Sequence, residues 1–370
     1  MNLPNAYARI NLENLAFNYR AIKQKAGEKT VICIVKADAY GHGAVHCAKK
    51  LERIGADYFA VASLDEAKEL RDAGIIHPIL ILGYIPLDRV CESIPYDLTY
   101  TVYSLRFADE LERCAAKENR QVKVHLKYNT GMNRLGFRGT DALRNAAEHI
   151  RNLGHLNIEG LFSHYATADE EDLEFTQTQH RQFLEGLNLL RDIGFELPMV
   201  HISNSAGIEV YDSDAASAVR PGIILYGIHP SSIVEEQNGL IIKPVMNFYS
   251  HIANISRLQP GDTVSYGRKF TAEKPMRIAV VCAGYADGYF RSLSNKAQVA
   301  VNGQRANIIG TICMDMFMVD ITDLTNIHVG DEVTLFGEGV PVTEVSDLAG
   351  TIPYELTCSV SKRVKRIYSE

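Results

Sequence analysis

The chain lacks the features that mark membrane-embedded, exported or nucleic-acid-binding proteins. Its 370 residues contain no run of about 18 apolar residues, and the first ten, MNLPNAYARI, lack the apolar core of a signal peptide. The net charge is −7, so no basic field attracts nucleic acid or an anionic membrane. Apolar residues make up 46% and charged residues 22%, as in ordinary globular proteins. The length favours two domains.

Metal-binding and redox motifs are also missing. The seven cysteines are scattered at positions 33, 47, 91, 114, 282, 313 and 358, and no pair has CxxC or zinc-finger spacing. There is no HExxH motif. We therefore expect no bound metal, and free thiols in a reducing cytoplasm.

From residue 12 to about residue 235, short apolar segments alternate with helical patterns. One helix is well marked, because Ser63 and Glu66 fit a capping box and Gly74 fits the stop. Eight strands separated by helices predict a (β/α)8 TIM barrel. An open doubly wound sheet is the alternative, but no GxGxxG follows the first strand. The predicted strands are Val31–Val35, Tyr58–Ala62, Ile79–Leu82, Tyr100–Tyr103, Val122–Lys127, Ile158–Ser163, Met199–Ile202 and Gly222–Tyr226.

After about residue 240, strand-like segments follow one another with short turns between them. The sequence VNGQ, residues 301–304, is typical of a hairpin. The end of the chain predicts a short helix and a basic tail. We therefore expect a barrel over residues 12–235, followed by a mostly β domain built from residues 1–11 and 236–370.

The segment VKADAYGHG places Lys36 at the end of the first predicted strand. Residues at this end of barrel strands carry the chemistry of such folds. A lysine partly removed from water has a lowered pKa and can form a Schiff base with an aldehyde. The alternative is a lysine that extends along the surface from a strand end. Gly41 and Gly43 allow close backbone approach, and His42 is interpreted as a local structural residue.

A second cluster follows the seventh predicted strand in HISNSAGI, which contains His201 and Ser205. A hydroxyl and free N–H groups at a helix start can bind an anion, and Gly222 and Ile223 could add further N–H groups. The alternative is an ordinary capped helix. Arg220, just before the last strand, is either functional or a surface ion-pair partner.

Together and in this order, these segments resemble the alanine racemases, pyridoxal-phosphate enzymes with a barrel followed by a β domain. The resemblance runs from Ile10 to Tyr368. It rests on VKADAYGHG, HISNSAG, VRPGIILYG, SYG (265–267), GYADG (284–288), CMDM (313–316) and the pair Tyr354-Glu355.

The resemblance implies a role for each matching residue. Lys36 is expected to hold the cofactor and act as one base, and Tyr266, from the partner subunit of a homodimer, as the other. Arg220 is expected to face the pyridine nitrogen, with His201 behind it. The phosphate would be held by Tyr40, Ser205, Gly222, Ile223 and Tyr354. The substrate would be bound by Arg134, Met314 and Tyr285, and the entrance lined by His164, Asp169 and Arg291.

The implied activity is interconversion of L- and D-alanine by a two-base mechanism on a pyridoxal-phosphate imine, with Lys36 and Tyr266 on opposite faces. It would supply D-alanine for peptidoglycan. Alternatives are a serine or broad-specificity racemase, a lyase or decarboxylase, and a non-catalytic cofactor-binding protein. A tyrosine base titrates near pH 10 and needs positive charge nearby to act at neutral pH, for which His164 and the arginines are candidates.

Two positions depart from the family pattern. Asn129 stands where a carboxylate is usual, which removes any local ion pair, and Thr311 replaces a common arginine, which weakens a pairing with Asp169. In some members the lysine at position 127 is carbamylated and braces the arginine that binds the substrate carboxylate.

Overall fold

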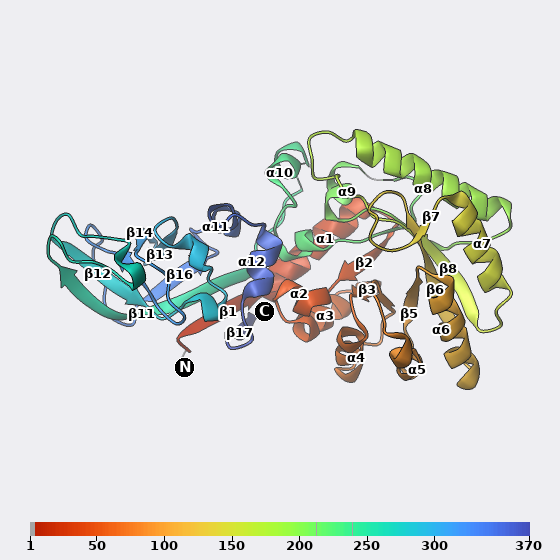
Figure 1. Ribbon diagram of the computed structural model, residues 1–370, viewed down its shortest axis with the longest axis horizontal. Helices are drawn as coiled ribbons and strands as arrows, with labels where there is room; N and C mark the ends of the chain where they lie inside the picture. The colour runs from red at the N-terminus through yellow and green to blue at the C-terminus, as the bar shows by residue number, and fades with distance from the viewer. Residues whose placement is uncertain (1–3, 212, 239) are drawn as a thin grey trace. The chain divides into compact units, whose positions relative to one another are not determined.

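The computed structural model describes residues 4–211, 213–238 and 240–370, and the chain forms two compact units (Figure 1). One unit comprises Leu15–Ala39 and Ala44–Lys243. The other comprises the described residues up to Asn14, together with Tyr40–Gly43 and Pro244–Glu370. The short segment Tyr40–Gly43 therefore belongs to the unit that contains the end of the chain.

The first unit is a closed barrel of eight parallel strands, which confirms the predicted fold. The ring closes because β5 pairs with β6 and β10 pairs with β2, and the two-residue β7 (Phe137–Arg138) adds alongside β6. In ring order the strands are β2 (Thr30–Ile34), β3 (Tyr58–Val61), β4 (Ile79–Ile81), β5 (Thr99–Val102), β6 (Val122–Asn129), β8 (Leu156–Phe162), β9 (Met199–His201) and β10 (Ala218–Val219).

The predicted eighth strand, Gly222–Tyr226, is wrong. These residues form the 3₁₀ helix η3 (Ile223–Tyr226), and the barrel strand is β10, which ends before Arg220. Pro221 lacks the N–H that a central strand donates. The apolar run imitates a strand because every residue of η3 is fully buried.

Helices follow the strands and cover the outside of the barrel (Figure 1). The capping box is confirmed: Ser63 caps α4, Glu66 completes the box, and Gly74 has φ +90° just beyond the end. The helices are α1 (Leu12–Ala26), α3 (Ala44–Arg53), α4 (Leu64–Asp72), α5 (Val90–Ser93), α6 (Leu105–Lys117), α7 (Thr140–Arg151), α8 (Glu174–Asp192), α9 (Ser205–Val210) and α10 (Ser232–Asn238), with the 3₁₀ helices η1 (Leu87–Arg89) and η2 (Ile94–Tyr96).

The expectation of free thiols throughout is wrong for one pair. Cys91 of α5 and Cys114 of α6 form a disulfide with their Cα atoms 4.8 Å apart. The other five cysteines form no disulfide among the described residues. The pair escapes motif analysis because 23 residues separate the two cysteines, and only the packing of α5 against α6 brings them together.

The second unit is a β domain. Strands β11, β12, β15, β14, β13 and β16 form a closed antiparallel ring, and β1 and β17 extend from β11. Asn302 and Gly303 have positive φ between β13 and β14, as the hairpin prediction requires. The strands are β1 (Ala6–Asn11), β11 (Met246–Leu258), β12 (Met276–Val281), β13 (Gln298–Val301), β14 (Gln304–Ile309), β15 (Phe317–Asp320), β16 (Glu332–Phe336) and β17 (Lys365–Ser369), with helices α11 (Val342–Ala349) and α12 (Pro353–Ser359).

The predicted basic tail contains the strand β17. β17 pairs in parallel with β1, from Tyr7–Lys365 to Asn11–Ser369. Within the described parts of the chain, no helix is both long and apolar enough to cross a membrane.

Candidate active site

Lys36 begins a short turn whose backbone is left-handed. The turn, α2 (Lys36–Tyr40), has φ values of 52°, 52° and 54° at Ala37, Asp38 and Ala39, and 55° at Tyr40. A non-glycine residue in this conformation costs about 1–2 kcal/mol. Four in succession need compensation from neighbouring groups.

Two carboxylates provide that compensation. Glu66 Oε1 accepts the N–H of Ala37 at 2.6 Å, and Asp38 Oδ1 accepts the N–H of Ala44 at 2.7 Å. The other oxygen of Glu66 accepts the N–H groups of Ala62 and Ser63 at the start of α4. The backbone that carries the partly buried Lys36 is thus tied to a helix cap.

The carboxyl end of the barrel is strongly cationic around Lys127. This lysine is buried, with Nζ 4.1 Å from the centroid of the Phe162 ring. Burial lowers its pKa well below the usual value, and repulsion from Arg220, Arg134 and Lys36 lowers it further. Among the described residues, no carboxylate forms an ion pair with Lys127. Such an end favours anionic ligands.

Arg220 lies buried in the barrel and is held by neutral groups. Its NH1 donates to His201 Nδ1 at 2.7 Å, and its NH2 donates to the carbonyls of Ser163 and Ile202 at 2.7 and 3.0 Å. NH2 also lies 3.1 Å from His164 Nδ1. Burial lowers the arginine pKa to about 9, so it stays protonated at neutral pH.

The Nε–H group of Arg220 has no hydrogen-bond partner within the described chain. An acceptor such as a ring nitrogen fits this donor, whereas a ring N–H does not. The donor set around Arg220 is therefore compatible with the pyridine of pyridoxal phosphate.

His164 is neutral rather than charged. Burial lowers its pKa well below the usual value, and Arg220 and Lys127 lower it further. His164 therefore does not supply positive charge that would favour Tyr266 as a base at neutral pH, and the prediction that it does so is wrong.

Two of the predicted phosphate ligands meet directly in the barrel. Ser205, the first residue of α9, accepts the N–H of Gly222 at 2.9 Å. Ile223 follows Gly222 and opens η3. Asn204 caps α9 by accepting the N–H of Gly207 at 3.0 Å, which leaves the Ser205 hydroxyl proton available as a donor.

The remaining two predicted phosphate ligands meet in the β domain. The rings of Tyr40 and Tyr354 lie 6.0 Å apart. Burial raises the pKa of Tyr40, and the neighbouring Tyr354 and Cys358 raise it further, so Tyr40 remains a hydroxyl donor. Gly41, with φ +83°, passes so close to the carbonyl of Thr357 that no Cβ would fit.

Tyr266 projects from the β domain at the start of the 3₁₀ helix η4 (Tyr266–Arg268), and 72% of its surface is exposed. Ser265 before it has φ +64°. Thr311 supports this turn from both sides: its hydroxyl donates to the Tyr266 carbonyl at 2.8 Å, and its own carbonyl accepts from the Ser265 hydroxyl at 2.6 Å. The residue that departs from the family pattern thus helps to present Tyr266.

The predicted substrate contacts Tyr285 and Met314 lie on two loops joined through their backbones. Tyr285 N–H donates to the Cys313 carbonyl, and Ala286 N–H donates to the Met314 carbonyl, both at 3.1 Å. Met314 is half exposed, and its own N–H has no partner within the described chain. Arg291 begins the 3₁₀ helix η6 (Arg291–Leu293).

Two protein-family domains match the sequence of the chain. The alanine racemase N-terminal domain matches residues 10–230, and the alanine racemase C-terminal domain matches residues 245–368. The chain belongs to the alanine racemase family.

Individual relatives align with this chain over nearly their whole lengths. Alanine racemase 1 of Clostridium acetobutylicum is 43% identical over 98% of this chain and 95% of that protein. The structure of the alanine racemase of Clostridium difficile 630 is 40% identical with a TM-score of 0.93, covering 100% of this chain and 97% of that one. The Bacillus anthracis alanine racemase with bound L-Ala-P is 33% identical with a TM-score of 0.93, covering 100% and 96%. The family resemblance and the isomerase class are confirmed.

The departure at Asn129 from the alanine racemase pattern preserves a turn. Asn129 Oδ1 accepts the N–H groups of Gly131 and Asn133 at 3.1 and 3.0 Å, and its amide donates to Asn133 Oδ1 at 3.2 Å. A carboxylate could accept the same two N–H groups. The exchange therefore removes a charge without removing the support of the loop that carries the exposed Arg134.

Sequence reasoning missed two residues behind His201. His125 Nδ1 lies 2.9 Å from His201 Nε2, and His125 Nε2 lies 3.4 Å from Glu159 Oε2. A signal was present in VKVHLKYN, where Lys123, His125 and Lys127 alternate along a strand that should be apolar when buried on both faces.

Proposed function

We propose that the chain interconverts L- and D-alanine with pyridoxal phosphate as cofactor, by a two-base mechanism in which Lys36 and Tyr266 serve opposite faces. The observation that carries this proposal is Arg220. Its guanidinium is buried and is held by neutral His201, and among the described residues neither a carboxylate nor any acceptor for its Nε–H lies against it.

Pyridoxal phosphate, when bound, withdraws electrons from the substrate and acidifies its Cα–H bond. Arg220 only donates hydrogen bonds, so it leaves the ring nitrogen as an acceptor and discourages its protonation. That weakens the electron withdrawal relative to a carboxylate partner. Prompt return of the proton to Cα is then favoured over transamination, which suits racemisation.

The other predicted site residues are assigned to the cofactor phosphate, the substrate carboxylate and the entrance. We assign the phosphate to Tyr40, Tyr354, the Ser205 hydroxyl and the backbone N–H groups of Gly222 and Ile223. The Gly222 N–H donates to Ser205 Oγ in this structure and would have to exchange that bond for one to the phosphate. The substrate carboxylate would meet Arg134 and the N–H of Met314, with Tyr285 beside it. His164, Asp169 and Arg291 would line the entrance.

A homodimer with shared sites would bring Tyr266 to the barrel of the partner subunit. The exposure of Tyr266 and Met314, at 72% and 52%, is consistent with a surface that another subunit covers. Lys36 Nζ would take or give the Cα proton on one face, and the Tyr266 hydroxyl on the other.

Solved relatives with bound L-Ala-P and with cycloserine support a small amino-acid substrate. A serine or broad-specificity racemase remains the alternative within this chemistry. A lyase or decarboxylase needs no second base at Tyr266, and a non-catalytic cofactor-binding protein needs no β domain. We further propose a cytoplasmic enzyme that supplies D-alanine for peptidoglycan.

A racemase assay on L-alanine and L-serine, with and without added pyridoxal phosphate, tests the activity. Formation of neither D-amino acid would refute both leading functions. Borohydride reduction followed by peptide mass spectrometry tests the anchor, and an adduct on a lysine other than Lys36 would refute its assignment.

Mixing Lys36→Ala and Tyr266→Ala subunits tests the shared site. With random exchange, half of the dimers are mixed and each carries one complete site, so we expect roughly one quarter of the parent activity. Each variant alone should be inactive by comparison. No recovery after verified exchange would contradict the shared site.

A further inference from the structure

A column of polar side chains runs through the barrel, where apolar residues are usual. Arg220 follows β10, His201 ends β9, His125 lies on β6 and Glu159 lies on β8. β6 and β9 are not neighbours, because β8 pairs with both. The contact between His125 and His201 therefore crosses the barrel interior.

The backbone is adapted to this column. The pairing of β6 with β8 shifts from Val124–Ile158 to His125–Gly160, so Glu159 is an extra residue on β8. Bulges of this kind redirect side chains and are frequent near active sites. Gly160 leaves room for the imidazole, since a Cβ there would lie 2.9 Å from His125 Cδ2.

The hydrogen bonds of the column can run in only one direction. Arg220 has no acceptor, so His201 Nδ1 must accept and the proton of neutral His201 sits on Nε2. That proton is donated to His125 Nδ1, which leaves the His125 proton on Nε2, facing the Glu159 carboxylate. Burial lowers the pKa of both histidines, in agreement with neutral rings.

The aromatic ring of Phe162 supports the same arrangement. It stacks on His201 with centroids 4.7 Å apart and an angle of 16°, and the Arg220 guanidinium lies 5.4 Å from its centroid. The plane of His201 is thus set by stacking. Its tautomer is left to hydrogen bonding.

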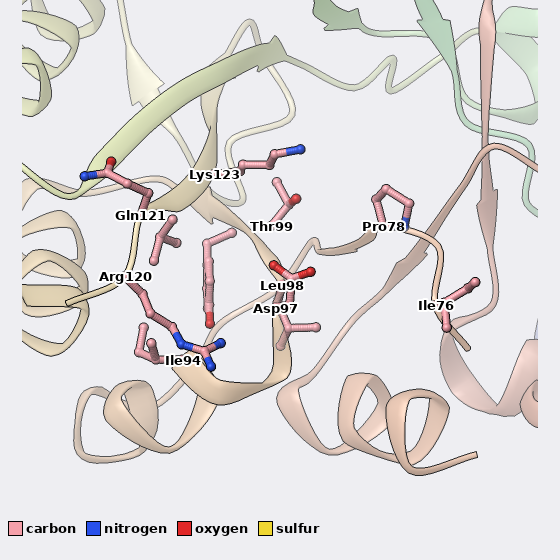
Figure 2. A pocket seen from close by; sticks show the side chains of 11 residues that line it. Ile76, Pro78, Ile94, Asp97, Leu98, Thr99, Arg120, Gln121 and Lys123 are labelled. Carbon is pink, nitrogen blue, oxygen red and sulfur yellow. The ribbon is translucent and has the colours of Figure 1, made fainter. Parts of the chain in front are cut away.

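The outer end of the column lies opposite Lys36. Lys123 Nζ lies 3.0 Å from Glu159 Oε1, and 55% of the Lys123 side chain is exposed against 16% of Glu159. Lys123 lines a pocket at the starts of β4, β5 and β6, together with Pro78, Thr99 and Gln121 (Figure 2). A change at Glu159 therefore reaches the end of the barrel that holds Lys36 through His125, His201 and Arg220.

We propose that Glu159 fixes the tautomer of His125, and that both are positioning residues that hold the ring of His201 and thereby aim the Arg220 guanidinium at the cofactor ring. The catalytic consequence rests on the proposed function. The tautomer itself is a property of the chain and can be observed without cofactor.

The test compares Glu159→Leu, which removes the acceptor, with Glu159→Gln, which keeps an acceptor but loses the charge. Nitrogen-15 NMR of the histidine-labelled, cofactor-free protein reports which ring nitrogen carries the proton. We expect Nε2–H on both His125 and His201 in the parent and in Glu159→Gln. In Glu159→Leu we expect mixed tautomers of His125, while His201 keeps Nε2–H because Arg220 donates to its Nδ1. His125→Asn should retain Nε2–H on His201, because the amide oxygen can replace the Nδ1 acceptor.

Glu112→Leu is the matched control. Glu112 accepts from His155 Nδ1 at 2.8 Å and is 18% exposed, close to the 16% of Glu159, but lies outside the column. Thermal melting of all variants separates misfolding from mispositioning.

In the holoenzyme we expect Glu159→Leu to lower kcat by about 10–100-fold with little change in KM, and to shift the absorption of the bound cofactor. Glu159→Gln should restore most of the activity. A parent tautomer pattern in folded Glu159→Leu would overturn the proposal, as would altered tautomers with an unchanged kcat. If the parent shows no racemase activity, the proposed function fails, while the NMR comparison still decides the tautomer role.

Discussion

The carboxylate of Glu66 accepts the backbone N–H of Ala37 at 2.6 Å, one residue after Lys36. The same side chain closes the capping box of α4 through the N–H groups of Ala62 and Ser63. One carboxylate therefore couples the start of a helix to a left-handed turn. This coupling predicts that a residue outside the proposed cofactor contacts controls the placement of the lysine.

We expect Glu66→Ala to lower the free energy of unfolding by about 1–3 kcal/mol, because a cap is lost and backbone donors lose their acceptor. Racemase activity should fall further than stability explains, since Lys36 loses its support. Denaturant unfolding and the steady-state rate measure the two effects. Glu69→Ala, at an exposed position of the same helix, is the control. Equal behaviour of the two variants would contradict the coupling.

The strain in the turn itself predicts an unusual response to glycine. Ala37 is exposed and has φ 52°, so Ala37→Gly relieves about 1–2 kcal/mol of strain while adding up to about 1 kcal/mol of unfolded-state entropy. We expect stability to stay constant or rise by about 1 kcal/mol. In contrast, Ala116→Gly, at an exposed position of α6, should lower it by about 1 kcal/mol. Matching losses in both variants would show that the turn is not strained.

Much of the fold was predictable because buried parallel strands are apolar throughout. β2 and β3 were predicted to within a residue for this reason. Gly222–Tyr226 was misassigned because a buried 3₁₀ helix has the same composition as a buried strand. The left-handed turn had no signal at all, since alanine does not prefer positive φ and only tertiary hydrogen bonds impose it.

The site was predictable as far as local motifs extend. Lys36, Ser205 and Arg220 stand beside strand ends, where position alone suggests chemistry. The contact of His125 with Glu159 depends on a shift in register between two strands 34 residues apart at these positions. No periodicity in a single strand encodes that shift.

Lys127 is expected to react with carbon dioxide. Burial and the neighbouring cations lower the pKa of its amine, which increases the fraction of reactive free amine, and Arg220 and Arg134 would stabilise a negative carbamate. Carbon-13 NMR after incubation with labelled bicarbonate should show one slow-exchanging carbonyl that is missing in Lys127→Met. Acidification should remove it, because protonation of the amine releases carbon dioxide. A spectrum identical for both proteins would refute the carbamate.

The disulfide predicts a stability that depends on redox conditions. The bridge between Cys91 and Cys114 closes a loop across a separation of 23 residues, for which chain entropy gives about 3 kcal/mol. Reductant should therefore lower the melting temperature of the parent protein but not that of Cys91→Ala. Cys358→Ala, which removes an exposed cysteine outside the disulfide, should respond like the parent. Activity well below the melting temperature should not change, because the bridge joins outer helices α5 and α6.

In a reducing compartment the bridge would open, so the barrel must fold without it. A parent melting curve that is insensitive to reductant, with two extra thiols titrated in the folded state, would mean that the bridge contributes nothing to stability.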